Sequence, residues 1–535
     1  MTAQEKTTRA HRLLQSLNLE DKKRLIQELL DRKSRDVVLA PMSKGQEALW
    51  YIHQSAPDSA AYNVAMAFHI HSPVERDKLE QALQLLAQRH EILRTSYAVV
   101  QGQNFQQIHP RAELQLQVVD ARILTEEQLH ARIVAHYRQP FDLSSPPVRA
   151  HFYQLAHGES VFLLVVHHIA TDAASLGILM EELAEIYPAL CHGQQPRLRE
   201  AGLSYREFCR QQANLLAGEK GRADRDYWTS TLSPDHPALT LDISRPRPAL
   251  QVYEGATHHF DIPAALSAQI STLAQARGIT PFSFCLAAWY CLLARHSGQQ
   301  DLCVSSPTAG RMQAGFQRSV GYFVNPVILR ASLEDNPCVG DFLDRVQQRV
   351  LEALEHQQYP FASVIEAVNP RRDPAYTPLA QVSFVFQRPQ QEQGLLEGWA
   401  PGQAGPRIRW AGLEVRQYPL NQQEGQFELE LEITANRDRL YGTLKFNSTL
   451  FDRAQMQKLA GHYCQLLQAM AAQPDAPVAQ LEMLTPEEYL ELDSWNQTRR
   501  DYPPHRSLHQ LIENQVARTP DGVALQFVEG PMTYA

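Results

Sequence analysis

The stretch VFLLVVHHIATDAAS at residues 161–175 constrains the fold more than any other part of the chain. Its apolar run VFLLVV is typical of a strand that is buried on both faces of a sheet. The segment that follows, SLGILMEELAEIYPAL at residues 175–190, has the period of an amphipathic helix. A buried strand that leads through a short polar loop into such a helix indicates a layered α/β fold.

The remainder of the chain has the same mixture of periods. Residues 62–70 alternate like a strand, and residues 76–93 then have helical spacing. In the second half, residues 252–262 and 426–451 read as strands, and residues 283–296 read as a buried core helix. The sequence therefore predicts the α/β class with mixed sheets, organised as two lobes.

The bulk composition limits the classes of function. A chain of 535 residues is too long for one hydrophobic core and is expected to form about three or four units. The net charge of -9 is modest and no basic block occurs, so no nucleic-acid partner is expected. A small or carrier-borne substrate fits this composition better.

Cysteine usage and the N-terminal sequence predict the compartment. The seven cysteines are odd in number and form no CxxC pair, which favours reduced thiols in the cytoplasm. Residues 1–15 lack the apolar core of a signal peptide. The most apolar segment, residues 283–296, is shorter than the roughly 20 residues that span a bilayer. We expect a cytoplasmic protein without a membrane partner.

Both ends of the chain differ from the α/β body. Residues 1–36 form a leader whose apolar stripe predicts a helix, which packs on the protein itself or docks another protein. Residues 484–506 are polar, contain Pro503-Pro504 and read as a linker. Residues 507–535 predict one helix, a turn and one strand, too little to close a core, so they start a further domain.

Three interpretations are open for His167, His168 and Asp172. If the strand continues through both histidines, their rings face opposite sides of the sheet, which disfavours a shared metal ion. Simple packing in the interior is the second interpretation. The third is chemistry, because a strand end that leads into a loop is where open α/β sheets place ligands. An imidazole there is suited to accept a proton or to position a nucleophile.

The same residues resemble the HHxxxDG pattern of condensation domains from non-ribosomal peptide synthetases. Further stretches resemble the successive motifs of that family in the same order over residues 40–480. They are MSKGQEALWYIHQ (42–54), RHEILRTSY (89–97), LSYREFCRQQ (203–212), VGYFVNPVILR (320–330), HQQYPFASVIEAV (356–368) and RRDPAYTPLAQVSFVFQ (371–387). The end of the chain, with MTYA, resembles the opening of an adenylation domain.

The resemblance implies two chloramphenicol-acetyltransferase-like lobes in a V-shaped pseudo-dimer with a central tunnel. We place the first lobe at residues 37–200 and the second at residues 201–483. It implies an amide-forming acyltransferase that binds no cofactor itself. Its partners are a donor carrier protein, an acceptor peptidyl carrier protein and a downstream adenylation domain, and the carrier proteins present 4'-phosphopantetheine arms.

The resemblance also assigns roles to the motif residues. His168 matches the histidine expected at the acceptor amine, as a base or as a positioning group, and His167 is expected to be structural. Asp172 is expected to form an ion pair with Arg311, and Arg94 is a second candidate partner. Tyr322 and Asn325 are expected to line the tunnel. No metal ion is expected.

One position departs from the family pattern, because Ala173 stands where the motif ends in glycine. A glycine there would allow a left-handed backbone angle or a close approach to the thioester. The alternative function is therefore an inactive condensation-like platform that recruits carrier or tailoring proteins. Cyclisation domains, epimerisation domains and free CoA-dependent acyltransferases fit this sequence less well.

The donor is the least determined partner. If Met1 is the true start, no carrier domain precedes the tunnel, so the donor arrives in trans. One possible donor is a fatty acyl group, delivered on a carrier protein or as acyl-CoA, which would make this a starter domain. The other is a peptidyl or polyketide chain.

Overall fold

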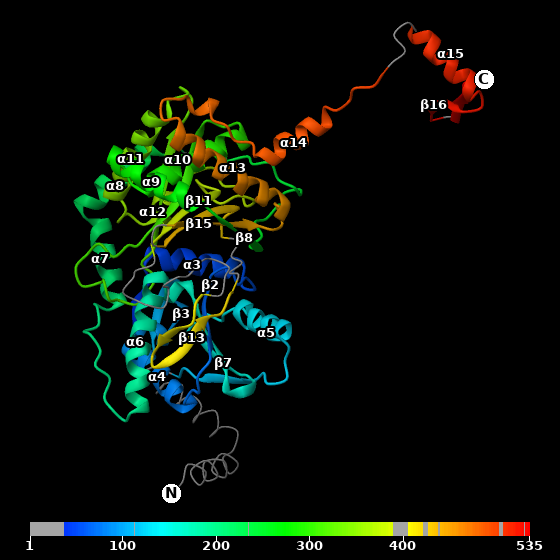
Figure 1. Ribbon diagram of the computed structural model, residues 1–535. Coiled ribbons are helices and arrows are strands. Elements are labelled where there is room, and N and C mark those ends of the chain that lie inside the picture. Colours follow the sequence, from blue (N-terminus) through cyan, green and yellow to red (C-terminus); the bar gives the residue numbers. More distant parts are fainter. Residues whose placement is uncertain are drawn as a thin grey trace. The chain divides into compact units, whose positions relative to one another are not determined.

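A computed structural model describes residues 37–111, 113–233, 235–388, 405–420, 426–436, 439–501, 507–528 and 530–535 (Figure 1). The predicted leader helix within residues 1–36 lies outside the described residues. The chain divides into one unit that ends at Met483 and a second unit, Leu484–Ala535. The two units are described separately below.

The first half of the large unit contains a six-stranded sheet with the order β12-β13-β2-β7-β6-β5, and a three-stranded sheet with the order β1-β4-β3. Strand β7 is central and is buried along its whole length, as its apolar run predicts. The elements are β1 (Val38–Pro41), α3 (Lys44–Ser55), β2 (Asn63–Ile70), α4 (Arg76–Arg89), η1 (Glu91–Arg94), β3 (Thr95–Val100), β4 (Gln103–Ile108), β5 (Leu116–Asp120), α5 (Glu126–Arg138), β6 (Val148–Gln154), η2 (Ala156–Gly158), β7 (Ser160–His167), η3 (His168–Ala170) and α6 (Ala173–Cys191).

The second half contains another six-stranded sheet, with the order β10-β9-β11-β14-β15-β8. Helices α9, α10, α11 and α13 pack on its strands (Figure 1). The elements are α7 (Tyr205–Ala217), α8 (Glu219–Thr231), β8 (Gly255–Asp261), α9 (Ala264–Arg277), α10 (Pro281–Ser297), β9 (Asp301–Thr308), β10 (Asn325–Ser332), α11 (Val339–Glu355), α12 (Phe361–Val368), β11 (Val382–Gln387), β12 (Ile408–Trp410), β13 (Leu413–Gln417), β14 (Leu429–Asn436), β15 (Arg439–Asn447), α13 (Arg453–Ala472) and η5 (Val478–Gln480). Both sheets are mixed, so the α/β class with mixed sheets is confirmed.

Helix α10 shows how local sequence sets these elements. The Thr280 side chain accepts a hydrogen bond from the N–H of Ser283, Pro281 occupies the first turn, and Gly298 ends the helix with a φ of 72°. Its buried residues run without a gap from Ser283 to Ala294, which confirms the predicted core helix. No single helix among the described residues is long and apolar enough to cross a membrane; the bent pair α9 and α10 passes that test only together.

The boundary between the two halves is less simple than a cut at residue 200. Strands β12 and β13 follow β11 in sequence, yet β13 pairs antiparallel with β2 of the first sheet through Val415 and Ile70. Tyr205, Phe316 and Phe323 also pack in the hydrophobic core of the first half. The predicted second lobe at residues 201–483 therefore contributes segments to the first, because apolar strands and rings from it complete that core.

The small unit contains α14 (Pro486–Trp495), α15 (Leu508–Arg518), β16 (Val523–Phe527) and β17 (Gly530–Thr533). Helix α14 lies inside the segment predicted to be a linker and has a capping box at Thr485. The described residues of this unit include no buried side chain, and Leu508, Leu525 and Phe527 are exposed. The unit therefore has no core of its own in the part that the structure describes.

Candidate active site

The histidine pair lies where β7 ends and a short 3-10 turn begins. His167 is the last residue of β7 and pairs with Asn63 of β2, whereas His168 is the first residue of η3. The N–H of His168 donates to the carbonyl of Tyr62 at 2.7 Å. The expectation that the two rings face opposite sides of the sheet depended on a strand that continues through both histidines. The strand ends at His167, so the turn η3 sets the direction of the His168 ring.

The His167 ring lies inside the first half. Its side chain is buried among the rings of His53, Tyr62 and Phe141. Nδ1 accepts a hydrogen bond from the N–H of Ile169 at 3.1 Å, so a neutral ring carries its proton on Nε2. Burial, with a smaller effect from neighbouring histidines and Arg149, lowers the pKa of His167 to about 3. The His167 ring therefore packs against other side chains than the His168 ring, which contacts Tyr322.

The low pKa of His167 predicts a pH-dependent stability. Below the free imidazole value of about 6.5 the unfolded chain binds a proton that the folded ring does not, so stability falls as the pH falls. In His167→Asn the amide oxygen can accept from Ile169 without titrating. Relative to that variant, wild type should lose about 2 kcal/mol of unfolding free energy between about pH 7.5 and about pH 5. Urea denaturation at both pH values measures this, and parallel curves would contradict it.

His168 has one nitrogen fixed and one free. Its Nδ1 lies 2.6 Å from the carbonyl oxygen of Thr171, and because a carbonyl only accepts, Nδ1 carries the proton. Nε2 then holds a lone pair and has no hydrogen-bond partner among the described residues. Burial lowers the pKa of His168 and Lys445 acts in the same direction, whereas the Thr171 carbonyl and Asp172 oppose the shift. The imidazole is therefore neutral at pH 7.

Asp172 and Arg311 form the predicted ion pair. Nη1 and Nη2 of Arg311 each donate to one carboxylate oxygen of Asp172 at 2.8 Å, a bidentate geometry. The two side chains are 8% and 1% exposed, so the pair is shielded from water. The guanidinium also lies 4.2 Å from the centre of the Phe323 ring. Arg94, the second candidate, donates instead to the carbonyl of His109.

Asp172 is also the N-cap of α6. Its Oδ1 accepts from the N–H of Ser175 at 2.8 Å, and its Oδ2 accepts from the N–H of Phe323 at 3.0 Å. One carboxylate thus caps a helix of the first half and holds a segment of the second.

Two residues of this network were missed by the sequence analysis. Ser175 accepts from Arg311 at 2.7 Å, and its hydroxyl donates to the carbonyl of Gly321 at 2.9 Å. The capping signal available in the sequence is Asp172 itself, a preferred N-cap residue, whose carboxylate accepts from the N–H three residues later at Ser175. No local signal marks Gly321, because its partner lies 146 residues away in the chain.

Ala173 was expected to lie in the loop that follows the two histidines. It is instead the first residue of α6. It is exposed, and it is not among the residues with positive φ. Of the two reasons given for a glycine at this position, the left-handed backbone angle is therefore wrong, since helical φ is available to any L-residue.

Ala173→Gly tests this correction. The added backbone freedom should lower the unfolding free energy by about 0.5–1 kcal/mol, because glycine disfavours a helix. The rate of amide formation should not change. A large gain in rate in a single-turnover assay would show instead that the methyl group limits the reaction.

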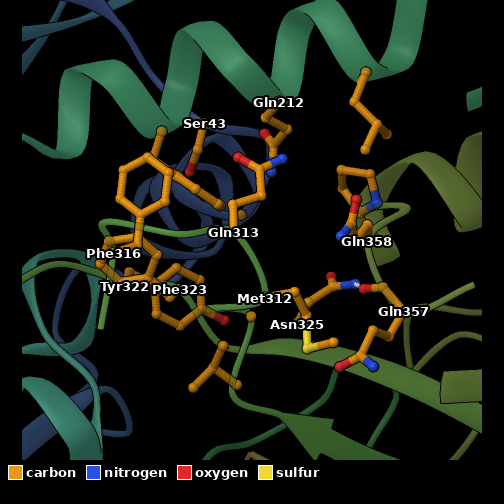
Figure 2. Close-up of a pocket in the computed structure, with 16 residues that line it drawn as sticks. Ser43, Gln212, Met312, Gln313, Phe316, Tyr322, Phe323, Asn325, Gln357 and Gln358 are labelled. Carbon is orange, nitrogen blue, oxygen red and sulfur yellow. Dashed lines mark hydrogen bonds between the residues drawn. The ribbon is translucent and has the colours of Figure 1, made fainter. Parts of the chain in front are cut away.

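Tyr322 and Asn325, the two residues expected to line a tunnel, both line a pocket (Figure 2). Asn325 donates to the carbonyls of Gln357 and Tyr359, each at 2.8 Å, and so shapes one wall. The ring of Tyr322 packs edge-on against His168, with the ring centres 5.0 Å apart. The pocket therefore adjoins the histidine through Tyr322.

The lining of this pocket combines apolar side chains with several amide groups and carries no charged side chain. Its amide side chains come from Gln212, Gln313, Asn325, Gln357 and Gln358 (Figure 2). The Oε1 atom of Gln313 is buried and has no hydrogen-bond partner among the residues that the structure describes. Such a lining fits a neutral ligand with its own hydrogen-bonding groups.

Two curated proteins match nearly the whole length of this chain. Tyrocidine synthase 3 of Brevibacillus parabrevis is 33% identical over 496 residues, which cover 92% of this chain and 7% of that protein. Malpinin synthetase of Mortierella alpina is 32% identical over 505 residues, which cover 94% of this chain and 6% of that protein. The chain thus spans only a small fraction of the length of these relatives.

A solved structure has the same fold. It is a holo four-domain nonribosomal peptide synthetase bound to AMP and glycine, with a TM-score of 0.82 and 25% identity, covering 93% of this chain and 38% of that one. The condensation-domain family model matches residues 38–492. This match includes both sheets, the histidine pair and the Asp172–Arg311 pair. The chain therefore belongs to the condensation-domain family of non-ribosomal peptide synthetases, the class of amide-forming acyltransferases that its sequence resembles.

Proposed function

We propose that this chain joins a carrier-bound donor acyl group to a carrier-bound aminoacyl acceptor, with His168 at the reacting amine. The observation that carries this proposal is the state of His168. Its Nδ1 is held by Thr171, its Nε2 lone pair is free, and burial keeps it neutral. A neutral imidazole with a free nitrogen is what an attacking amine needs as a proton acceptor or as a positioning partner.

The reaction balances without a cofactor in the chain. The acceptor amine attacks the donor thioester carbonyl, a C–N bond forms, and the C–S bond breaks as the tetrahedral intermediate collapses. The amine proton passes to Nε2 of His168 and then to the departing thiolate. Because a thioester is already activated, most of the rate gain comes from alignment, which supplies up to roughly 7–11 kcal/mol in ideal cases.

The uncharged pocket supports an arm-like ligand. A phosphopantetheine arm carries two amide groups, and the pocket beside Tyr322 offers several amide side chains and no charge. In this proposal the arm belongs to the partner carrier proteins and not to the chain itself. Gln313, whose Oε1 lacks a partner in the described structure, is placed to accept from an amide N–H of the arm.

The donor is proposed to arrive on a carrier protein or as acyl-CoA. A fatty acyl donor would make the chain a starter domain, and a peptidyl or polyketide donor would make it an elongating one. We favour an acyl donor supplied in trans. The residues around His168 do not distinguish these donors, so the assay below uses all of them.

The domain organisation is part of the proposal. Residues 37–200 and 201–483 are the two lobes, with the exchange of β12 and β13 described above, and residues 484–506 link them to the next domain. Residues 507–535 are proposed to begin an adenylation domain. The exposed Leu508, Leu525 and Phe527 support this, because apolar side chains on a helix and a hairpin need a core to cover them.

The alternative of an inactive platform rested on Ala173. Because Ala173 is an exposed helical residue, that reason is weakened, and the intact pairing of Asp172 with Arg311 favours an active site. The platform remains the second outcome of the assay.

A condensation assay tests the proposal. The chain is mixed with an acceptor-loaded carrier protein and separately with fatty acyl-carrier, acyl-CoA and peptidyl-carrier donors, and amide is detected by mass spectrometry. At least one donor should give amide, and an acceptor carrier without its amino acid should give none. If no donor gives amide while carrier loading is complete, the platform function is favoured.

A further inference from the structure

Three consecutive residues of the second half, Gly321 to Phe323, are held by side chains that come before them in the sequence. Ser175 donates to the carbonyl of Gly321 and accepts from its N–H. The hydroxyl of Tyr205 donates to the carbonyl of Tyr322 at 2.6 Å, and Asp172 accepts from the N–H of Phe323 at 3.0 Å. The backbone of Tyr322 is therefore fixed on both sides.

The ring of Tyr322 contacts the His168 ring and also lies against Gly45. Its edge-to-face contact with the His168 ring has an interplanar angle of 75°. A Cβ atom placed on Gly45 would lie 2.8 Å from Cε1 and 3.2 Å from Cδ1 of Tyr322. Real Cβ contacts are not this short, so a side chain at position 45 would push the ring. The same ring lines the pocket (Figure 2).

We propose that Tyr322 is a positioning residue that holds the His168 ring with Nε2 turned to the substrate, and that Gly45 is required because it leaves space for that ring. The proposal rests on the proposed function of His168. In this proposal the Asp172 network affects the reaction as well as stability, because Asp172 and Ser175 hold the segment that carries Tyr322.

The physical reason is that one hydrogen bond does not fix a ring. The bond from Nδ1 to Thr171 allows the imidazole to tilt about that contact, and a second contact with the Tyr322 ring restricts this freedom. The phenol does so without adding charge, because burial raises its pKa and keeps it protonated. The charged or titratable groups around His168 are Asp172, Lys445 and His167.

Activity measurements test the coupling between Gly45 and Tyr322. Gly45→Ala should lower kcat for amide formation by about tenfold to a hundredfold, as expected for a misplaced reacting group. Alanine is the better helix former, so helix propensity does not explain such a loss. Tyr322→Ala should lower kcat by a similar factor, and Tyr322→Phe, which keeps the ring, should recover most of the activity that Tyr322→Ala loses. In the Tyr322→Ala background, Gly45→Ala should cost nothing further.

Gly405→Ala is the control, since no described residue lies within 4 Å of a Cβ placed there. It should behave like wild type. An equal loss from Gly45→Ala with and without the Tyr322 ring would overturn the proposal, because the two residues would then act independently.

A measurement that does not depend on activity separates this proposal from the proposed function. NMR titration of ¹⁵N-labelled histidine gives the His168 pKa directly, with the signal assigned by its loss in His168→Gln. Tyr322→Ala should raise this pKa towards the ordinary value of about 6.5, because the ring is exposed to water, and Tyr322→Phe should not. An unchanged pKa in folded Tyr322→Ala overturns the positioning role. Absence of amide from wild type, with the shift present, would count against the proposed function alone.

Discussion

His168→Ala is expected to lower kcat for amide formation by about 100-fold to 10,000-fold, the range for loss of a general base. The variant removes the nitrogen at this site whose lone pair is free in the described structure, together with the hydrogen bond from Nδ1 to the Thr171 carbonyl. Single-turnover kinetics with loaded carriers measures the loss.

Two controls show whether the loss of rate is specific to His168 and chemical in origin. His192→Ala, at an exposed histidine, should leave the rate unchanged. The circular dichroism spectrum of His168→Ala should match wild type, and the variant should remain folded under the assay conditions, so that the loss is chemical and not a loss of fold. Unchanged turnover in folded His168→Ala would remove His168 from the reaction.

Asp172→Ala should destabilise the protein by about 3–5 kcal/mol, the typical cost of leaving one member of a buried ion pair without its partner. The Arg311 side chain is only 8% exposed and would keep its charge, and α6 would also lose its N-cap. Urea denaturation at neutral pH measures the change in unfolding free energy.

A double-mutant cycle isolates the pair. Arg311→Met with Asp172→Ala should be less destabilised than the sum of the single variants, because no buried charge is then left unpaired. Asp120→Ala, which breaks the exposed pair with Arg122, should give a normal denaturation curve. A normal curve for Asp172→Ala itself would show that the ion pair does not stabilise the fold.

The local features of the site could be predicted from the sequence. The apolar run of β7, the polar turn and the amphipathic α6 follow from residue periodicity, and this placed His168 at the end of a strand. Arg311 was also identified as the first candidate partner of Asp172, although only through the family resemblance.

The contacts between distant segments could not be predicted. Phe323 donates to Asp172 across 151 positions and Ser175 holds Gly321 across 146, and no periodicity in either segment encodes such a pairing. The addition of β13 to the first sheet is of the same kind, since its apolar alternation fits either sheet equally well. The error at Ala173 arose because a motif position was read as a loop position without knowing where α6 begins.

The central claim of this account is that His168 presents an unprotonated Nε2 to the substrate. Its most direct test is the ¹⁵N NMR spectrum of histidine-labelled protein at neutral pH, with His168 assigned by subtraction of the His168→Gln spectrum. The structure predicts a protonated Nδ1 and an unprotonated Nε2. A proton on Nε2, in either the neutral or the charged ring, would contradict the claim, because that nitrogen could not accept a proton from the attacking amine.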